Sequence, residues 1–377
     1  QAFYFVYYGY DLLGEPLVEG EDWIGLFKGD VCVGSQVVSD AITTVPAMGN
    51  DGYALTSGYL LEGDIPHYKI YDASEDMVYD GVPSVVYPFS QNGMFHVLSL
   101  NGAITQTLDL HGGANLVSFY VLPEDASLTS VLSPLAGNIT SVITEGSAAN
   151  YVDPLGWIGS LEEFSLSNGY WLIMESAAML EVSGQSSVSG YQYDLFSGAN
   201  LISFSAQGSV DLSSAIPDDV EPLFEAIISE GAAALNTEIG WMGSLTYFEG
   251  GSGYWVIVSE DLSFSYETGS MARAEIRRYV ETRPSGSAFE VAQSPNQAFY
   301  FVGEINLDEG AIEYGDWILS YNDNVLTGIR QWQGVMIDIP TMGLSESKET
   351  EGYFEVGDIP SFRLLKQATG EIIPLGG

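Results

Sequence analysis

Short apolar stretches separated by turn residues recur along the whole chain. The segments AFYFVYY (2–8) and DWIGLF (22–27) have the length and the aromatic and aliphatic content of strands. In HYKIYDASEDMVYD (67–80) a polar turn joins two alternating runs, which predicts a β-hairpin. Long helical patterns are scarce, and only LTSVLSPL (128–135) and EPLFEAIISEGAAAL (221–235) are typical of short helices or irregular turns. The pattern predicts a mainly all-β fold.

The sextet QAFYFV begins the sequence and returns at residues 297–302. Further matches keep one constant offset between the two ends, namely Asp22-Trp23-Ile24 with Asp316-Trp317-Ile318 and Gly63-Asp64-Ile65-Pro66 with Gly357-Asp358-Ile359-Pro360. Chance does not preserve so many spacings. One module therefore occurs at both ends of the chain, and its short strands and turns predict an immunoglobulin-like β-sandwich.

A second pair of repeats lies between the end modules. GANL occurs at 113–116 and 198–201, and GWIGSL at 156–161 is matched by GWMGSL at 240–245. The middle is thus a tandem duplication of a β-rich module with short helical turns. We expect five parts: a β-sandwich at 1–105, repeat copies at 106–188 and 189–269, an arginine-containing connector at 270–295, and a second, C-terminally incomplete sandwich at 296–377.

The charge is strongly one-sided. Fifty-one acidic residues stand against ten basic ones, which gives a net charge of −41. This argues against nucleic acid and anionic membrane surfaces as partners and favours a saline or divalent-rich habitat. No apolar run approaches the roughly 18 residues of a membrane-spanning helix. Without an initiator Met or a signal peptide, we expect a soluble mature product or an excised fragment. The single cysteine, Cys32, is expected to be a buried free thiol.

Enzyme motifs are not found in the sequence. The histidines His67, His96 and His111 have no paired spacing for zinc, and the chain has no nucleophile elbow, P-loop or dinucleotide fingerprint. Carboxylates are too numerous for a glycosidase pair to be singled out, so glycoside hydrolysis is a distant alternative. We therefore expect a protein that is not an enzyme and that needs no cofactor, with calcium as the one ion to consider.

Two sets of residues are candidate binding sites. A flat indole face suits a sugar ring, but matching placement in both middle repeats favours core packing for the tryptophans Trp157, Trp171, Trp241 and Trp255. Oxygen ligands at alternate positions in the hairpin turn could hold calcium; they are Asp72, Ser74, Asp76 and Asp80. The turn departs from an EF-hand loop at Met77 and Pro83, which favours a solvated acidic turn.

The quoted modules resemble a known type. EGEDWIGLFKGDVCVGSQVV…GDIPHYKIYD and GANLISF…GWMGSL…GYW are similar to β-sandwich and companion repeat modules of large secreted or cell-surface proteins of marine, Bacteroidetes-like bacteria, many exported in the manner of type IX cargo. The resemblance spans nearly all of the chain except the connector and implies an extracellular or cell-surface location. The second end module has YNDNVLTG (321–328) in place of FKGDVCVG (27–34), so no binding site is carried over.

The ends of the repeats suggest how the protein functions. The run AFYFVYY lacks polar alternation, which is typical of a strand covered on both faces. The alignment of the end modules lacks a counterpart of residues 84–100 in the second copy, and an incomplete sandwich exposes a strand edge. We expect a secreted structural protein whose copies join head to tail by strand addition into a filament or surface layer. The expected contacts are Phe3, Tyr4, Phe5 and Tyr7, with Arg273, Arg277, Arg278 and Arg283 of the connector as an electrostatic latch. The alternative is a monomeric adhesin that binds extracellular glycans.

Overall fold

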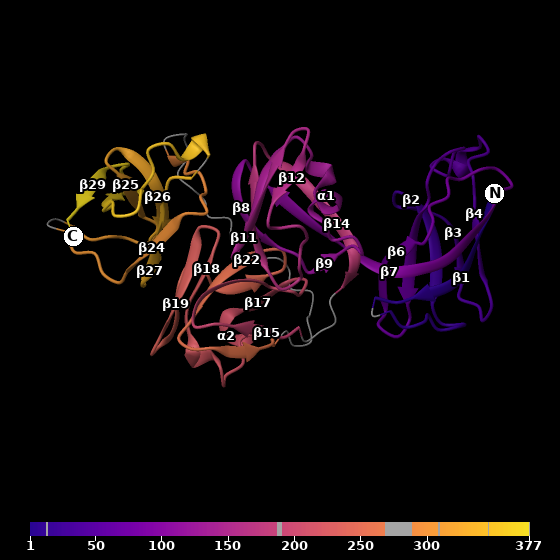
Figure 1. Ribbon diagram of the computed structural model, residues 1–377, viewed down its shortest axis with the longest axis horizontal. Helices are drawn as coiled ribbons and strands as arrows, with labels where there is room; N and C mark the ends of the chain where they lie inside the picture. The colour runs from indigo at the N-terminus through magenta and orange to yellow at the C-terminus, as the bar shows by residue number, and fades with distance from the viewer. Residues whose placement is uncertain (13, 187–190, 268–288, 308–309, 346, 377) are drawn as a thin grey trace. The chain divides into compact units, whose positions relative to one another are not determined.

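The computed structural model describes residues 1–377 except 13, 187–190, 268–288, 308–309, 346 and 377. Strands make up 51% of the structure and helices 6%, so the prediction of a mainly all-β fold is confirmed. The chain forms two compact units (Figure 1). The first contains 1–106, 121–125 and 181–188, and the second contains the other described residues. None of the helices in the described part of the chain has the length and apolarity that a membrane crossing requires.

The first unit is a sandwich-like β-sheet structure. Its main strands follow the order β3-β2-β5-β6-β7-β1-β4, and β3 packs against β4 so that the sheet encloses one core. The elements are β1 (Ala2–Tyr10), β2 (Trp23–Lys28), β3 (Val31–Val37), β4 (Thr43–Ala47), a 3₁₀ helix (Ala54–Thr56), β5 (His67–Asp72), β6 (Met77–Pro83), β7 (Met94–Leu110), β9 (Val121–Leu122) and β14 (Ala178–Ser186). Residues 107–110 of β7 and 178–180 of β14 belong to the second unit. The polar turn predicted within 67–80 joins β5 and β6 as an antiparallel pair, so the predicted hairpin is confirmed.

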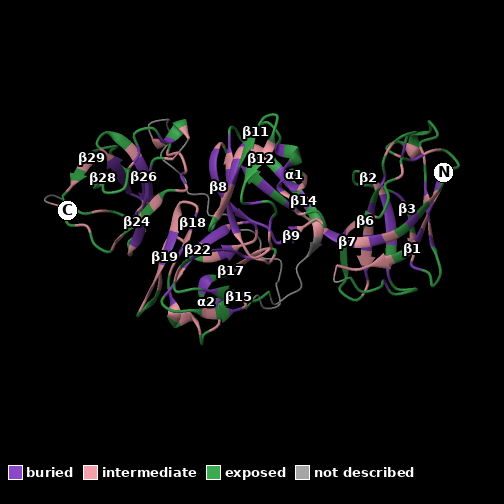
Figure 2. Ribbon diagram, viewed as in Figure 1, coloured by how far each residue is buried: buried purple, intermediate pink, exposed green. Residues whose placement is uncertain are grey.

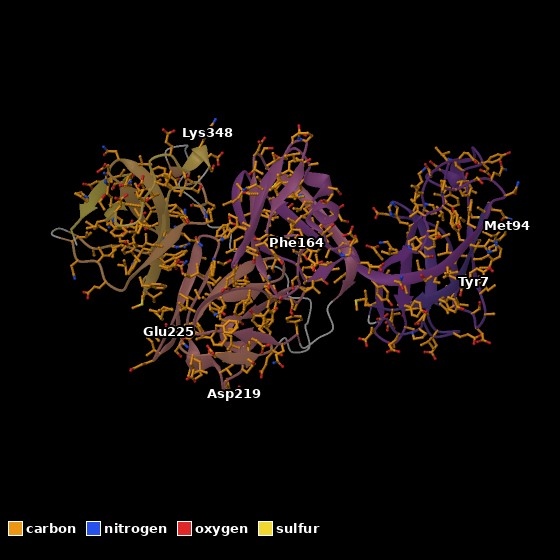
Figure 3. All side chains as sticks on the ribbon, in the orientation of Figure 1. Tyr7, Met94, Phe164, Asp219, Glu225 and Lys348 are labelled. Carbon is orange, nitrogen blue, oxygen red and sulfur yellow. The ribbon has the colours of Figure 1, made fainter. Side chains whose placement is uncertain are left out.

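Strand β7 closes the first unit by bonding to two neighbours. Its first half runs parallel to β1, with Phe95 opposite Tyr4, and its later residues pair antiparallel with β6. Tyr4 is fully buried, and its ring lies 4.9 Å from Phe95 and 6.1 Å from Tyr68. Tyr7 and Met94, on β1 and β7, are labelled in Figure 3. The core of this unit therefore depends on a strand that connects β6 to β1.

Two expectations for the first unit are wrong. Strand β1 is not covered on both faces, because burial alternates along it and Tyr8 is 58% exposed. Cys32 is exposed rather than buried, since it lies on the outer side of β3, while Val33, next to it, points into the core. Alternation along a strand sends neighbouring side chains to opposite faces, which explains both differences.

The two middle repeats have the same topology. In the first the sheet order is β12-β11-β10-β13-β8, and in the second β20-β19-β18-β22-β16. The first has β8 (Gly113–Ser118), α1 (Leu128–Val131), a 3₁₀ helix (Ser133–Leu135), β10 (Ile139–Thr144), β11 (Ser147–Val152), β12 (Gly156–Gly159) and β13 (Gly169–Met174). The second has β15 (Tyr193–Leu195), β16 (Gly198–Ser203), β17 (Ser209–Asp211), α2 (Leu212–Ala215), a 3₁₀ helix (Glu221–Leu223), β18 (Phe224–Ser229), β19 (Ala232–Thr237), β20 (Gly240–Gly243), β21 (Tyr247–Glu249), β22 (Gly253–Val258) and β23 (Leu262–Phe264).

The short-helix prediction is confirmed for 128–135, which holds α1 and a 3₁₀ turn. It is wrong for most of 221–235, where only Glu221–Leu223 is helical and β18 and β19 form a hairpin. The β-branched residues Ile227 and Ile228 pair with Ala234 and Ala233 across this hairpin, so cross-strand packing prevails over the helical preference of the alanines.

Reciprocal contacts join the two repeats. The carboxylate of Glu145 accepts the backbone N–H of Leu201 at 2.8 Å, and its counterpart Glu230 accepts the N–H of Leu116 at 2.9 Å. The same hydrogen bond is thus formed in both directions between the repeats, as in an isologous dimer. Between them lies an apolar cluster whose buried members are Ala114, Leu116, Trp171 and Leu201, with Ile143, Ile173 and Trp255 packed against it. The duplication has produced one body with internal pseudo-twofold symmetry.

The C-terminal module repeats the strand arrangement of the first unit in two separate sheets. Its elements are β24 (Gln297–Val302), β25 (Trp317–Asn322), β26 (Val325–Gln331), β27 (Ile337–Met342), a 3₁₀ helix (Lys348–Thr350), β28 (Ser361–Leu365) and β29 (Ile372–Leu375). One sheet has the order β26-β25-β28-β29, and the other is the pair β24-β27. Phe299 faces Pro340 as Phe3 faces Pro46, so β24 corresponds to β1 and β27 to β4.

Candidate functional site

The C-terminal module contains two strand edges that no other strand of the described residues pairs. In the first unit β7 bonds to both β1 and β6. Within the described residues, β24 pairs only with β27, and β29 pairs only with β28 (Figure 1). Since β24 and β29 correspond to β1 and β6, both edges border the position that β7 occupies in the first unit. The module lacks one closing strand in the described structure.

Strand β24 consists of intermediate and exposed residues and has no buried one (Figure 2). Tyr4 is 0% exposed, whereas its counterpart Tyr300 is 39% exposed. Tyr300 keeps an edge-to-face contact with Phe362 at 5.3 Å, as Tyr4 does with Tyr68. Among the described residues, no aromatic ring takes the place beside Tyr300 that Phe95 has beside Tyr4. Ala298 is likewise exposed, although its counterpart Ala2 is fully buried.

A groove of about 550 Å³ opens beside this face. Its apolar lining comes from Ala298 and Tyr300 on β24 and from the segment before β28, and the residues concerned are Ala298, Tyr300, Leu344, Phe354, Val356 and Pro360. Val356 is completely exposed to solvent. The groove is therefore an opening into the interior of the sandwich, with an apolar floor and, along one side, an edge of β24 that no other described strand pairs.

One rim of the groove corresponds to a segment that forms backbone hydrogen bonds with Phe89 in the first unit. There the N–H of Gly63 donates to the carbonyl of Phe89 at 2.9 Å, and the N–H of Phe89 donates to the carbonyl of Asp64 at 2.7 Å. The counterparts Gly357 and Asp358 line the groove, and no bond of this kind to them is found among the described residues. This rim offers a backbone donor and a backbone acceptor to an incoming chain.

The far end of the groove is partly filled. In the first unit the Phe89 ring lies so close to Gly49 that a Cβ at Gly49 would approach it to 2.7 Å. At the counterpart Gly343, the N–H donates to the Asn296 carbonyl at 2.6 Å, and the Asn296 side chain donates to Leu344 O at 2.7 Å. Asn296 therefore covers the end that Phe89 covers in the first unit, and the open part of the groove lies along Ala298 and Tyr300.

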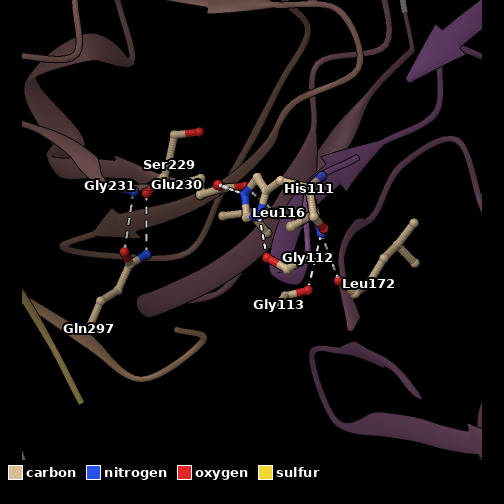
Figure 4. A network of polar contacts seen from close by, with 10 residues as sticks. His111, Gly112, Gly113, Leu116, Leu172, Ser229, Glu230, Gly231 and Gln297 are labelled. Carbon is tan, nitrogen blue, oxygen red and sulfur yellow. Dashed lines mark hydrogen bonds and ion pairs between the residues drawn. The ribbon is translucent and has the colours of Figure 1, made fainter. Parts of the chain in front are cut away.

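Strand β24 is held in place by a network that reaches the repeats (Figure 4). The Gln297 side chain donates to Ser229 O at 3.2 Å and accepts the N–H of Gly231 at 3.4 Å. Glu230, between these two residues, lies 2.6 Å from His111 Nε2. The hydrogen bond to this carboxylate raises the pKa of His111 to about 9. His111 is therefore charged at neutral pH and fixes the turn that carries Glu230.

A buried ion pair fixes the same module to the second repeat. Arg330 Nη2 donates to Asp338 Oδ2 at 2.8 Å, and both side chains are buried. Asp338 also accepts the N–H groups of Ser244 at 2.5 Å and Ala233 at 3.2 Å, and Arg330 donates to Gly231 O at 2.5 Å. These bonds compensate the desolvation of both charges. They position β27, and through it β24, against a rigid support.

The residues of the first strand that were predicted to contact a neighbouring subunit do not line this groove. β1 is paired on both edges, by β4 and β7, so it is an ordinary strand of its own unit. Tyr4 belongs to the core, and the prediction that Tyr4 touches a neighbouring molecule is wrong for this structure. Phe3, Phe5 and Tyr7 are half-buried on the outer face, where Phe5 stacks on His96 at 5.2 Å. The predicted latch residues Arg273, Arg277, Arg278 and Arg283 lie outside the described residues.

The tryptophans divide into framework and surface positions. Trp171 is buried in the cluster between the repeats, and Trp255 packs against that cluster. Trp241 packs on the core of the second repeat and donates its Nε1–H to Glu221 at 2.7 Å. Trp157 is half-buried and lies edge-on to the exposed Tyr151, with ring centroids 5.5 Å apart. Trp157 is thus the member of this set that has an aromatic partner at the surface.

The acidic turn uses its carboxylates locally. Asp72 accepts the N–H and the hydroxyl of Ser74 at 2.9 and 2.8 Å, and Asp76 accepts the Tyr71 hydroxyl at 2.9 Å. The hydroxyl of Thr105 donates to Asp80 at 3.3 Å. The structure does not bring these carboxylates together, and no cluster of three or more His, Cys, Asp or Glu able to hold a metal is found where the chain is described.

The sequence signal for the groove was the missing counterpart of residues 84–100. That signal concerns the C-terminal module, whereas the aromatic run led to contacts being predicted on the first strand, at the other end of the chain. No protein-family model, curated protein or solved structure matches this chain.

Proposed function

We propose that the protein is a non-enzymatic, secreted structural protein, a subunit of an extracellular filament or cell-surface assembly. Neighbouring molecules join by strand addition, and the acceptor is the groove beside β24. The observation that carries the proposal is that β24 and β29 each have one edge that no other described strand pairs, and that these edges border an exposed apolar face. Edges of this kind are normally covered, and another chain covers them by extending the sheet.

Two further features support an assembly outside the cell. The chain has 51 acidic and 10 basic residues, and its negative net charge makes free molecules repel one another at low salt. Screening by the ions of saline water removes this repulsion. The modular, duplicated architecture resembles that of large secreted and cell-surface proteins. The bonds of Gln297 and Asp338 to the second repeat provide a rigid base through which load on an added strand passes into the rest of the unit.

Electron microscopy and light scattering of the purified chain in saline buffer test the proposal. We expect regular oligomers or fibres, which disappear with Ala298→Arg, because a large charged side chain then occupies the groove. Ala298 is exposed, so the variant should fold. The matched control is Val335→Arg, at an exposed apolar residue of the same module that does not line the groove. A chain that stays monomeric at high concentration would contradict the proposal.

A monomeric glycan-binding adhesin is the second candidate. It is favoured by one observation, the surface pair of Trp157 and Tyr151. On a glycan array, binding that is lost with Trp157→Ala and kept with Ala298→Arg would support this alternative and not the assembly.

A further inference from the structure

Two sites related by the internal pseudo-twofold symmetry lie where a turn of one repeat meets the other repeat. The Glu230 site combines the turn of Glu230 with His111, and the Glu145 site combines the turn of Glu145 with Phe196. The N–H of His111 donates to the asparagine side chain four residues further on at 2.8 Å, and the N–H of Phe196 does the same at 2.9 Å. His111 and Phe196 therefore hold equivalent positions, and the two sites can be compared residue by residue.

The Glu230 site is occupied by two cationic side chains of this chain. His111, which is charged at neutral pH, lies 2.6 Å from Glu230 Oε1, and Arg330 Nη2 donates to Gly231 O at 2.5 Å. The other carboxylate oxygen of Glu230 accepts the N–H of Leu116 at 2.9 Å. This turn therefore binds an imidazolium at its carboxylate and a guanidinium at its backbone carbonyl.

The equivalent turn of the first repeat has no such partners. Glu145 Oε2 accepts the N–H of Leu201 at 2.8 Å, but no hydrogen bond or ion pair to Oε1 is found among the described residues. Phe196 takes the place of His111 and is 71% exposed. In the described structure, a Cβ added at Gly146 would meet no atom within 4 Å. A carboxylate oxygen and an aromatic ring are therefore both accessible at this turn.

These groups line a pocket of about 450 Å³, a size that suits a small ligand. Tyr191 adds a second aromatic side chain, which is 37% exposed and lies edge-on to Tyr193 at 5.1 Å. Asp194 adds a second carboxylate, and the hydrogen bond from the Ser263 hydroxyl at 2.5 Å lowers the pKa of this carboxyl. The described residues that line the pocket include no basic one. The pocket thus combines negative charge with aromatic surface.

We infer that this pocket binds a guanidinium group, supplied by a small organic cation or by an arginine side chain of another polypeptide. The group pairs with Glu145 and lies against Phe196 and Tyr191, because a guanidinium both bonds to carboxylates and stacks on aromatic rings. The Glu230 site supports this ligand, since its turn binds the same two kinds of cation from within the chain. The net charge of −41 adds a general attraction for cations. The inference does not depend on how molecules assemble.

Calorimetric titration of n-butylguanidinium chloride into the full chain at low salt tests the inference. We expect saturable binding, and we expect neutral n-butylurea, which has a similar shape, not to bind. Glu145→Gln should weaken binding about tenfold or more, because a charge-assisted hydrogen bond is lost. The matched control, Glu225→Gln, removes the same charge at an exposed residue that does not line the pocket, and it should leave binding unchanged.

A second variant gives the Glu145 site the residue of the Glu230 site. Because Phe196 is exposed, Phe196→His should fold. The introduced imidazole should pair with Glu145 and abolish binding of n-butylguanidinium. Its pKa, followed by NMR, should lie above the ordinary 6.5, as that of His111 does. An introduced imidazole that titrates at its ordinary pKa while the probe still binds would contradict the equivalence of the two sites.

The remaining outcomes decide the ligand. The inference is wrong if n-butylguanidinium does not bind, or if Glu145→Gln and Glu225→Gln weaken its binding equally. It is also wrong if n-butylurea or the disaccharide cellobiose binds as tightly, because the pocket would then be a site for neutral ligands. A capped pentapeptide with one central arginine among glycines distinguishes the sources. Tighter binding of this peptide than of n-butylguanidinium indicates a polypeptide partner, and the reverse indicates a small cation.

Discussion

The buried pair of Arg330 and Asp338 allows a quantitative test of how the C-terminal module is held. The corresponding residues of the first unit are Gln36 and Thr44, so this strand arrangement also forms without the charges. Replacing Asp338 by Thr leaves the Arg330 guanidinium buried without its carboxylate. Removing one partner of a buried pair costs about 3–5 kcal/mol. The backbone N–H groups of Ser244 and Ala233 lose their acceptor at the same time.

The double variant, Arg330→Gln with Asp338→Thr, installs the residues of the first unit. No unpaired charge is then buried, and the remaining loss is that of hydrogen bonds, about 0.5–1.5 kcal/mol each. We therefore expect the double variant to be more stable than Asp338→Thr alone. Asp64→Asn breaks the exposed pair with Lys28 and is the control, for which we expect little change.

Hydrogen exchange followed by mass spectrometry measures the effect where it arises. Peptides that contain Ala233 and Ser244 report on the amides bonded to Asp338. A loss of 3–5 kcal/mol accelerates exchange through local opening by about 10²–10⁴-fold in the single variant. If Asp338→Thr exchanges as slowly as the unmodified chain, or if the double variant is less stable than the single one, the interpretation of this pair is refuted.

Two further predictions concern the repeats. Because the pKa of His111 is raised to about 9 from an ordinary 6.5, the pair with Glu230 stabilises the fold fully below about pH 6.5 and loses this effect as the pH rises through 9. Between pH 6 and 10 the melting temperature should fall less in His111→Gln than in the unmodified chain, because the contribution of the pair is already absent. An unchanged pH profile of the melting temperature would contradict this role of the pair. Trp171→Ala should cost about 3–5 kcal/mol in chemical denaturation because the ring is buried between the repeats, whereas Trp157→Ala should cost clearly less; equal losses would contradict the assignment.

Much of the architecture could be predicted from repeated local patterns. The two copies of QAFYFV and of GDIP identified the matching end modules, and GANL and GYW identified the middle duplication. Side-chain alternation and turn residues act over a few positions, so strands and turns can be predicted from the local sequence. The β18–β19 hairpin was missed because alanines next to β-branched residues have no clear local preference, and cross-strand packing decided the outcome.

The candidate site depended on long-range pairing instead. AFYFV is the same five residues in β1 and β24, yet Tyr4 is buried and Tyr300 is exposed, because β7 covers one copy and no described strand covers the other. Whether a strand edge is paired depends on segments far away in the chain. A short stretch of sequence therefore cannot predict it. The sequence by itself determined which modules exist and which strands they contain. Only the tertiary structure decided which strand edges are paired among the described residues, because burial depends on neighbours in space.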